Sequence, residues 1–328
     1  MKKYIAILLA AAMATLGISA CRKENSNKET KVQKDSDIKV VTTIFPEYDW
    51  VRQIAGEEAD QMDITMLLDN GVELNSYQPT AEDIMKVSDC DLFVYVGGES
   101  DAWVDDVLKQ AKNKDMQVVN LLDVLGNSVK EEEVIEGMEP EEEGGEEEEP
   151  EYDEHVWLSV KNAEVLSKAI ADALEKADPD HKDVYQENAS AYSEKLKNLD
   201  AKYQEVVDGA SQKTLLFGDR FPFRYLVDDY GLSYYATFVG CSAESEASFE
   251  TISFLANKVD ELGLKDIMAL ENSNQKIAKT IIENTKEKNQ KILTLDSMQS
   301  TISDDVKNGT TYLSVMEKNF EVLKEALQ

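Results

Sequence analysis

One long helical segment constrains the fold of this chain more than any other feature. Residues 181–207 keep a helical spacing of apolar side chains over about 27 residues, roughly 40 Å at about 1.5 Å per residue. A second helical stretch, residues 160–177, precedes it, and Asp178-Pro179 separates the two. A helix of this length predicts a spine that joins two domains.

Short apolar runs alternate with helical runs on both sides of this spine. The expected strands are 39–43, 62–67, 92–96 and 117–121 before it, and 214–217, 233–239, 266–271 and 292–295 after it. The expected helices are 47–55, 80–87 and 104–111 before it, and 225–230, 251–261 and 274–286 after it. Such alternation predicts an α/β fold with parallel, βαβ-built sheets. A Phe-Pro pair at a strand-to-helix junction of each half, at 45–46 and 221–222, indicates two similar lobes.

The N-terminus resembles an export signal. Lys2 and Lys3 precede an apolar run at 5–18 that is too short for a spanning helix. The run ends in Ile-Ser-Ala followed by Cys21, which resembles a bacterial lipobox, whereas an ordinary signal peptide that contains a cysteine is the alternative. A lipobox implies that the Cys21 thiol receives a diacylglycerol and anchors the protein outside the cytoplasm, on the cell membrane.

These features predict a domain organisation. The tether is polar and lacks aromatic residues, so it cannot offset its own ordering entropy. The expected parts are a signal peptide (1–20), a lipidated tether (21–37), an N-terminal α/β lobe (38–180) with a disordered acidic loop (131–154), a linking helix (181–208) and a C-terminal α/β lobe (209–328).

The net charge of the chain indicates which classes of ligand it can bind. With 66 acidic and 34 basic residues the formal net charge is −32, so nucleic acid and anionic lipid are poor partners and cations are good ones. Within the acidic loop, glutamates either form a solvated insert or concentrate cations near the site that follows. Glutamates alone would exchange metal quickly and add little selectivity.

His155 is the first candidate metal ligand. It is one of two histidines, and it lies between the acidic loop and an apolar Val-Trp-Leu run. A structural or solvated histidine is the alternative. His181, at the start of the long helix, is expected to be solvated or to cap that helix. Cys90 and Cys241 are far apart in sequence, and the sequence leaves open whether they pair or remain free thiols.

Several ordered motifs resemble one known family, the metal-specific substrate-binding lipoproteins of bacterial zinc and manganese ABC importers. The resemblance covers nearly the whole chain after Cys21. The motifs are VVTTIFP at 40–46 with IAG at 54–56, NSYQPTAEDI at 75–84, DEHVWL at 153–158, YGL at 230–232 with EAS at 246–248, and LDS at 295–297.

The resemblance implies a fold and a function. It implies two α/β lobes joined by a rigid long helix, with one divalent metal, zinc first and manganese next, held in the cleft between them and delivered to an ABC permease. Family ligands are two histidines, a third His or Glu, and a terminal Asp. His155 and Asp296 match this pattern, whereas Asn75 stands at the first position and Arg220 at the third.

Both departures change the expected chemistry. The Asn75 carbonyl is a neutral, hard donor that favours Ca²⁺, Mg²⁺ or Mn²⁺ over Zn²⁺. Arg220 cannot ligate, and its charge about 4 Å from a dication would cost about 8 kcal/mol at an effective dielectric of about 20. Arg220 is therefore expected either to pair with Asp296 or to be replaced as ligand by a nearby carboxylate. The candidate carboxylates are Asp219, Glu244 and Glu271.

Other functions are less well supported by the residues. An enzyme needs a nucleophile or an acid/base pair, and with two histidines in the chain no Ser-His or Cys-His arrangement is evident. A binding protein for an anionic or chelated ligand held by Arg220 and Asn75 is the stronger rival. A surface adhesin-like lipoprotein has no sequence feature in its favour. The prediction is a monomeric, lipid-anchored metal-binding protein that is not an enzyme.

Overall fold

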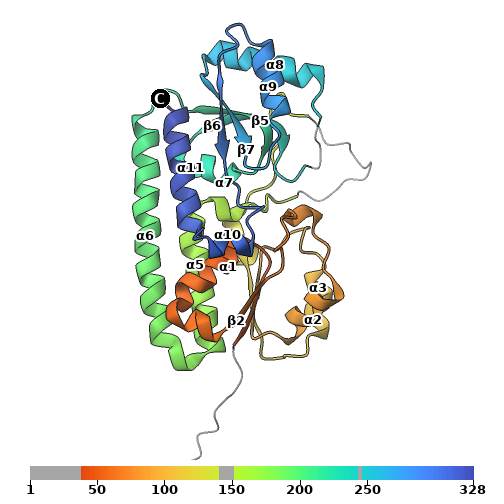
Figure 1. Ribbon diagram of the computed structural model, residues 1–328, viewed down its shortest axis with the longest axis vertical. Coiled ribbons are helices and arrows are strands. Elements are labelled where there is room, and N and C mark those ends of the chain that lie inside the picture. Colours follow the sequence, from red (N-terminus) through yellow and green to blue (C-terminus); the bar gives the residue numbers. More distant parts are fainter. Residues whose placement is uncertain (1–37, 140–150, 243–245) are drawn as a thin grey trace, which may run out of the picture. The chain divides into compact units, whose positions relative to one another are not determined.

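The computed structural model describes residues 38–139, 151–242 and 246–328, which form two parallel four-stranded sheets with flanking helices (Figure 1). The first sheet contains β1 (Lys39–Thr42), β2 (Asp63–Met66), β3 (Leu92–Tyr95) and β4 (Gln117–Asn120). The second contains β5 (Thr214–Phe221), β6 (Ser233–Val239), β7 (Asp266–Leu270) and β8 (Lys291–Leu295). Their orders, β2-β1-β3-β4 and β6-β5-β7-β8, are the same arrangement used twice. The prediction of two similar α/β lobes is confirmed.

Helices surround both sheets. They are α1 (Phe45–Ala55), α2 (Ala81–Asp89), α3 (Val104–Gln110), α4 (Leu121–Leu125), α5 (Val160–Ala177), α6 (Lys182–Gly209), α7 (Arg224–Tyr230), α8 (Phe249–Leu262), α9 (Lys276–Asn284), α10 (Ser303–Lys307) and α11 (Tyr312–Ala326). Two short 3₁₀ turns matter for the site, η2 (Leu74–Ser76) and η4 (Val156–Leu158). Helices α4, α10 and α11 were not predicted, and β5 runs four residues beyond its predicted end at Phe217.

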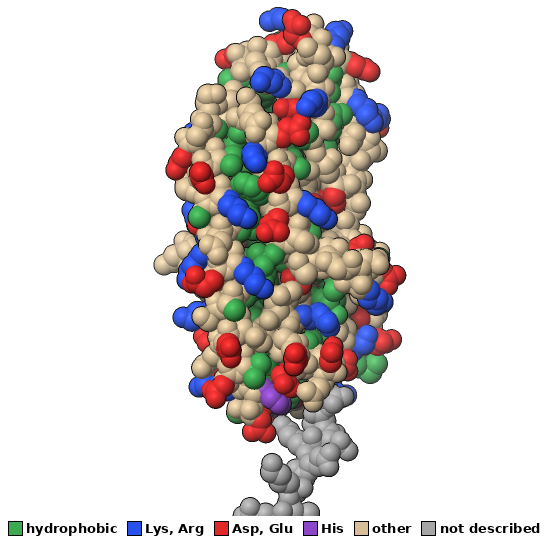
Figure 2. All heavy atoms as spheres, turned by 60° about the vertical axis from the view of Figure 1, so that its left-hand side comes forward, with side chains coloured by type: hydrophobic (Ala, Val, Ile, Leu, Met, Phe, Trp, Pro, Cys, Tyr) green, Lys and Arg blue, Asp and Glu red, His purple; other side chains and the backbone are tan. Residues whose placement is uncertain are grey.

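The long helix α6 contacts helices from both lobes. Its buried side chains fall on one stripe, since they recur every three, four or seven positions: Tyr185, Tyr192, Leu196, Leu199, Tyr203 and Val207. The Tyr203 hydroxyl donates to the Met316 carbonyl of α11 at 2.7 Å, and the Asn188 amide donates to the Ile54 carbonyl of α1 at 2.9 Å. The face of the molecule in Figure 2 carries acidic and basic side chains interspersed rather than segregated. The predicted spine is therefore present.

The apolar interior is mostly continuous between the lobes. One cluster of buried residues includes Val40 and Phe93 of the first sheet, Tyr203 of α6, and Phe217 of the second sheet. A smaller cluster packs α8 and α9 against the second sheet: Leu216, Ile252, Leu255, Ile267 and Ile281. The lobes thus share a core around the spine rather than meeting only at a polar cleft.

The flanks of the acidic segment have defined structure. Glu131 and Tyr152 form an antiparallel bridge, the Glu139 amide donates to the Thr237 carbonyl at 2.9 Å, and Met138 is buried. This differs from the expectation of a disordered loop over 131–154, because strand-like pairing and an apolar anchor hold 131–139 and 151–154. Residues 140–150 lie outside the described residues.

Several N-terminal predictions also fall outside the described residues: the signal peptide, the tether and the lipidation site Cys21. In the described ranges, no helix combines the length and apolar character that a bilayer crossing requires. Cys90 and Cys241 are both free thiols, which settles the open question of their pairing.

Candidate metal centre

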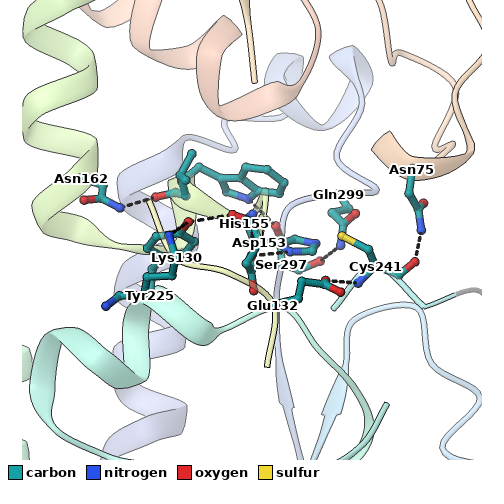
Figure 3. A network of polar contacts seen from close by, with 12 residues as sticks. Asn75, Lys130, Glu132, Asp153, His155, Asn162, Tyr225, Cys241, Ser297 and Gln299 are labelled. Carbon is teal, nitrogen blue, oxygen red and sulfur yellow. Dashed lines mark hydrogen bonds and ion pairs between the residues drawn. The ribbon is translucent and has the colours of Figure 1, made fainter. Parts of the chain in front are cut away.

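His155 lies in a buried turn directly before η4 (Figure 3). Its side chain is 3% exposed, and its Nδ1 is 3.0 Å from Asp153 Oδ1. The same oxygen accepts the His155 backbone N–H at 2.8 Å, so one carboxylate orients both the ring and the main chain. Burial alone would lower the pKa of His155, but the Asp153 carboxylate raises it above its ordinary value. A carboxylate on one ring nitrogen is the usual arrangement behind a metal-binding imidazole.

The C-terminal lobe holds this turn in place. The Tyr225 hydroxyl donates to the Asp153 carbonyl at 2.7 Å and accepts the Lys130 N–H at 3.0 Å. Gly240, just after β6, faces the imidazole, and a Cβ there would lie 2.9 Å from His155 Cε1. Only glycine therefore allows the end of β6 to approach the ring this closely.

Two carboxylates stand at the carboxyl ends of neighbouring strands of the second sheet. Glu271 follows β7 and accepts the Ser297 N–H at 2.9 Å and its hydroxyl at 2.8 Å. Asp296 follows β8, and its Oδ1 accepts the Met298 N–H at 2.8 Å. Burial raises the pKa of both groups, and Asp296 further raises that of Glu271. The turn at His155 reaches this edge through Trp157, whose indole N–H donates to the Ser297 carbonyl at 2.9 Å.

Asn75 lies in the N-terminal lobe and Arg220 in the C-terminal lobe. Each side chain forms a hydrogen bond with a residue of the opposite lobe. Asn75, in η2, donates from its amide to the Cys241 carbonyl at 2.8 Å. Arg220, near the end of β5, binds both carboxylate oxygens of Glu73 at 2.6 Å. The expected pairing of Arg220 with Asp296 is wrong, because Glu73 offers a bidentate partner that the sequence did not single out.

The other predicted cleft carboxylates differ in their roles. Asp219 accepts the backbone N–H groups of Arg220 and Leu270, so it ties β5 to β7. Glu244 lies outside the described residues.

Glu132 accepts the Cys241 N–H at 3.4 Å and lines an open depression of about 990 Å³ with Tyr152. Burial, then Asp153, raises the pKa of Glu132 to about 7.

The described residues contain no group of three or more His, Cys, Asp or Glu side chains close enough to hold a metal ion together. The donor types still suit a divalent cation, since an oriented imidazole and carboxylates are ligands that such ions use. Of the acids in this region, Glu73 pairs with Arg220, and Asp296 Oδ1 accepts the Met298 N–H. Burial strongly raises the pKa of the Cys241 thiol, which disfavours the thiolate that a metal would need.

Sequence reasoning missed three residues of this region: Glu73, Glu132 and Gly240. Glu73 lies only two residues before Asn75, which is the signal that could have found it. Glu132 is one of many glutamates in the acidic segment, and composition does not separate it from the rest. Gly240 matters because it lies against the His155 ring in the folded protein, and no sequence pattern predicts that contact.

Comparison with known proteins identifies the family. The sequence model described as "Zinc-uptake complex component A periplasmic" matches residues 40–326. The chain belongs to this family. The predicted resemblance is thereby confirmed, and the family serves zinc uptake and is not a class of enzymes.

Two relatives and one solved structure illustrate the match. The zinc-binding lipoprotein AdcA of Streptococcus pneumoniae R6 is 34% identical over 98% of this chain, and the match spans 61% of AdcA. The high-affinity zinc uptake system protein ZnuA of Bacillus subtilis is 30% identical over 99% of this chain and 98% of its own length. The crystal structure of the Zn(II)-bound ZnuA-like domain of S. pneumoniae AdcA superposes with a TM-score of 0.69 at 31% identity, covering 89% of this chain and 99% of that domain. This chain therefore spans about three fifths of the AdcA relatives but nearly all of ZnuA.

Proposed function

We propose that this protein captures a divalent transition metal, zinc first and manganese next, between its lobes and delivers it to an ABC importer permease. The observation that carries the proposal is the buried, carboxylate-oriented imidazole of His155 at the junction of the lobes. In this proposal His155, Asp296 and Asn75 are the metal ligands. Family membership and the zinc-binding names of the relatives support it.

The charge distribution supports a cation as cargo. The chain carries a net charge of −32, and Glu132, Glu271 and Asp296 lie around or beside the site. Carboxylates that face a cleft raise the local concentration of cations and speed their capture. An imidazole among them favours zinc over magnesium or calcium, which prefer an all-oxygen site.

A binding titration with matched histidine variants tests this function. His155→Ala should abolish tight zinc binding in competition with a zinc chelator, because it removes the one imidazole of the proposed site. His181→Ala is the matched control, since His181 precedes α6 and its ring bonds to Asp178. Elemental analysis of protein purified without chelator should find zinc, or manganese, in the wild type. Unchanged affinity in His155→Ala would refute the site.

We further propose that Cys21 carries a lipid anchor that keeps a monomeric protein at the outer face of the cell membrane. The supporting features are the lipobox-like residues before Cys21 and the lipoprotein name of AdcA. Cys21→Ala should release the protein from the membrane fraction into the periplasm or medium. A variant that still sediments with lipid would refute the anchor.

Rival functions have weaker support. An anionic or chelated ligand would need a free Arg220, but both of its terminal nitrogens are engaged by Glu73. An adhesin role is not favoured by any feature of the described residues. Equilibrium dialysis that recovers an organic ligand instead of metal would favour the first rival.

A further inference from the structure

The Arg220–Glu73 pair bridges the two lobes inside the candidate metal centre. Glu73 directly precedes η2 of the N-terminal lobe, and Arg220 lies in β5 of the C-terminal lobe. Both N–H···O distances are 2.6 Å, and the guanidinium also points one nitrogen at the Ser242 carbonyl at 3.4 Å. The side chains are only 19% and 29% exposed, so solvent screens this pair less than a surface ion pair.

The positive charge of Arg220 acts on the same acidic side chains that a bound metal ion would neutralise. Glu73 is two residues from Asn75, and its carboxylate is close enough to His155 for the two to interact electrostatically. Arg220 also interacts electrostatically with Asp219 and Glu271. A guanidinium at this point neutralises the acids that a divalent cation would otherwise neutralise.

We propose that Arg220 is a tethered competitor of the metal, and that the metal displaces it and takes Glu73 as a ligand. This inference rests on the proposed function and adds to it the residue that completes the site. Arg220 holds both carboxylate oxygens of Glu73, so a metal ion must break this pair before it can bind Glu73.

Competition of this kind lowers the apparent affinity for metal. Only the fraction of molecules in which Glu73 is free of Arg220 is ready to bind, and the measured dissociation constant rises by the inverse of that fraction. Arg220 would then restrict tight binding to ions that compensate for breaking the pair, and it would help to expel the ion when the metal is delivered.

A double-mutant cycle on zinc affinity tests the proposal. Arg220→Gln should tighten zinc binding about tenfold by freeing Glu73, and Glu73→Gln should weaken it about tenfold. In the double variant the gain from Arg220→Gln should vanish, because no carboxylate remains to be freed. Simple repulsion between Arg220 and zinc predicts instead the same gain in both backgrounds, and that result would overturn the proposal.

Further variants distinguish the proposal from a general charge effect and from a purely structural ion pair. Arg224→Gln removes a positive charge from the same lobe, at a residue that pairs with Glu133 and Asp228, and should leave zinc affinity unchanged. A purely structural ion pair predicts a lower melting temperature without zinc for Arg220→Gln and no gain in affinity. If Arg220→Gln does not fold, Arg220→Lys, which has a single-point donor, should give a smaller gain that also depends on Glu73.

The outcomes also distinguish this inference from the proposed function. Loss of binding in His155→Ala together with wild-type affinity in Glu73→Gln would refute the role of Glu73 and leave the metal-binding function standing. Wild-type protein that binds no zinc and no manganese would refute the function itself.

Discussion

The two lobes share one sheet topology but supply the candidate site in different ways. In the C-terminal lobe the polar groups sit on strands or directly after them: Arg220 in β5, Glu271 after β7 and Asp296 after β8. In the N-terminal lobe they lie beyond strand ends, with Asn75 in η2 and His155 far along the chain from β4. The C-terminal lobe thus offers groups fixed by its sheet, and the N-terminal lobe offers groups fixed by loops.

The loop that carries His155 belongs to the N-terminal half by sequence but is held mainly from the other lobe. Tyr225 binds the Asp153 carbonyl, Trp157 binds the Ser297 carbonyl, and the Tyr312 hydroxyl donates to the Trp157 carbonyl at 2.7 Å. The position of the imidazole therefore depends on the C-terminal lobe, so substitutions in that lobe should change metal affinity without touching a ligand.

Gly240→Ala should lower zinc affinity more than the other substitutions, because it disturbs the support that the C-terminal lobe gives to the His155 ring. The new methyl group would lie 2.9 Å from the His155 ring and 3.1 Å from the Phe221 carbonyl, so the ring or β6 must shift. We expect zinc affinity to fall by about tenfold to 100-fold, since a misplaced ligand loses much of its binding energy. Competition titration measures this. Gly209→Ala, where a Cβ meets no atom within 4 Å, is the matched control and should bind zinc normally.

Tyr225→Phe should have an intermediate effect on both stability and affinity. It removes the hydroxyl that joins Lys130 to Asp153, leaving a buried carbonyl without that donor, so we expect a loss of about 2 kcal/mol in unfolding free energy. Denaturant unfolding and zinc titration measure the two effects. Tyr230→Phe in the same helix loses its bond to Asp200 but should keep wild-type affinity. Equal affinity losses in both variants would show that α7, not the bond to Asp153, matters.

Asp101→Asn should give the smallest effect and tests the N-terminal lobe alone. Burial raises the pKa of Asp101 from 3.8 to about 7, and its Oδ2 accepts the Gly97 N–H. Because the folded pKa is the higher one, the stability linked to this proton is present below about pH 4 and is lost as the pH rises to about 7. The amide variant should therefore be more stable than the wild type at pH 8 and no more stable at pH 4. Thermal melts at both pH values measure this, and a gain that is the same at both would contradict the linkage.

Most of the fold could be predicted because local patterns specify it. β-Branched residues mark β1, aromatic and aliphatic residues mark β3 and β6, and helical spacing marks α5 and α6. Helix α4 was missed because it begins at Leu121, immediately after β4, where the apolar run continues the strand pattern. The extension of β5 to Phe221 was missed because Gly218, Asp219 and Arg220 lack strand propensity. Arg220 and Phe221 pair with β6 only after a shift in register that follows Phe217.

The candidate site was less predictable, for a physical reason. His155, Asn75 and Asp296 were found through motifs, whereas the partner of Arg220 is 147 positions away in the sequence, and only the meeting of two lobes brings Glu73 to it. Charge alone did not favour Glu73 over the other acids of the chain. The flanks of the acidic segment were likewise expected to lack structure, since composition does not reveal that Met138 is buried and that Glu131 pairs with Tyr152.

X-ray absorption of the zinc-loaded protein tests the central claim most directly. We expect scattering from one imidazole with a zinc–nitrogen distance of about 2.0 Å. Oxygen donors should complete the shell, and no sulfur should appear at a zinc–sulfur distance of about 2.3 Å. His181→Ala should leave this spectrum unchanged, and any zinc that His155→Ala still binds weakly should show no imidazole signal. An imidazole signal that survives His155→Ala, or a sulfur shell from Cys241, would contradict the claim that His155 and carboxylates hold the metal between the lobes.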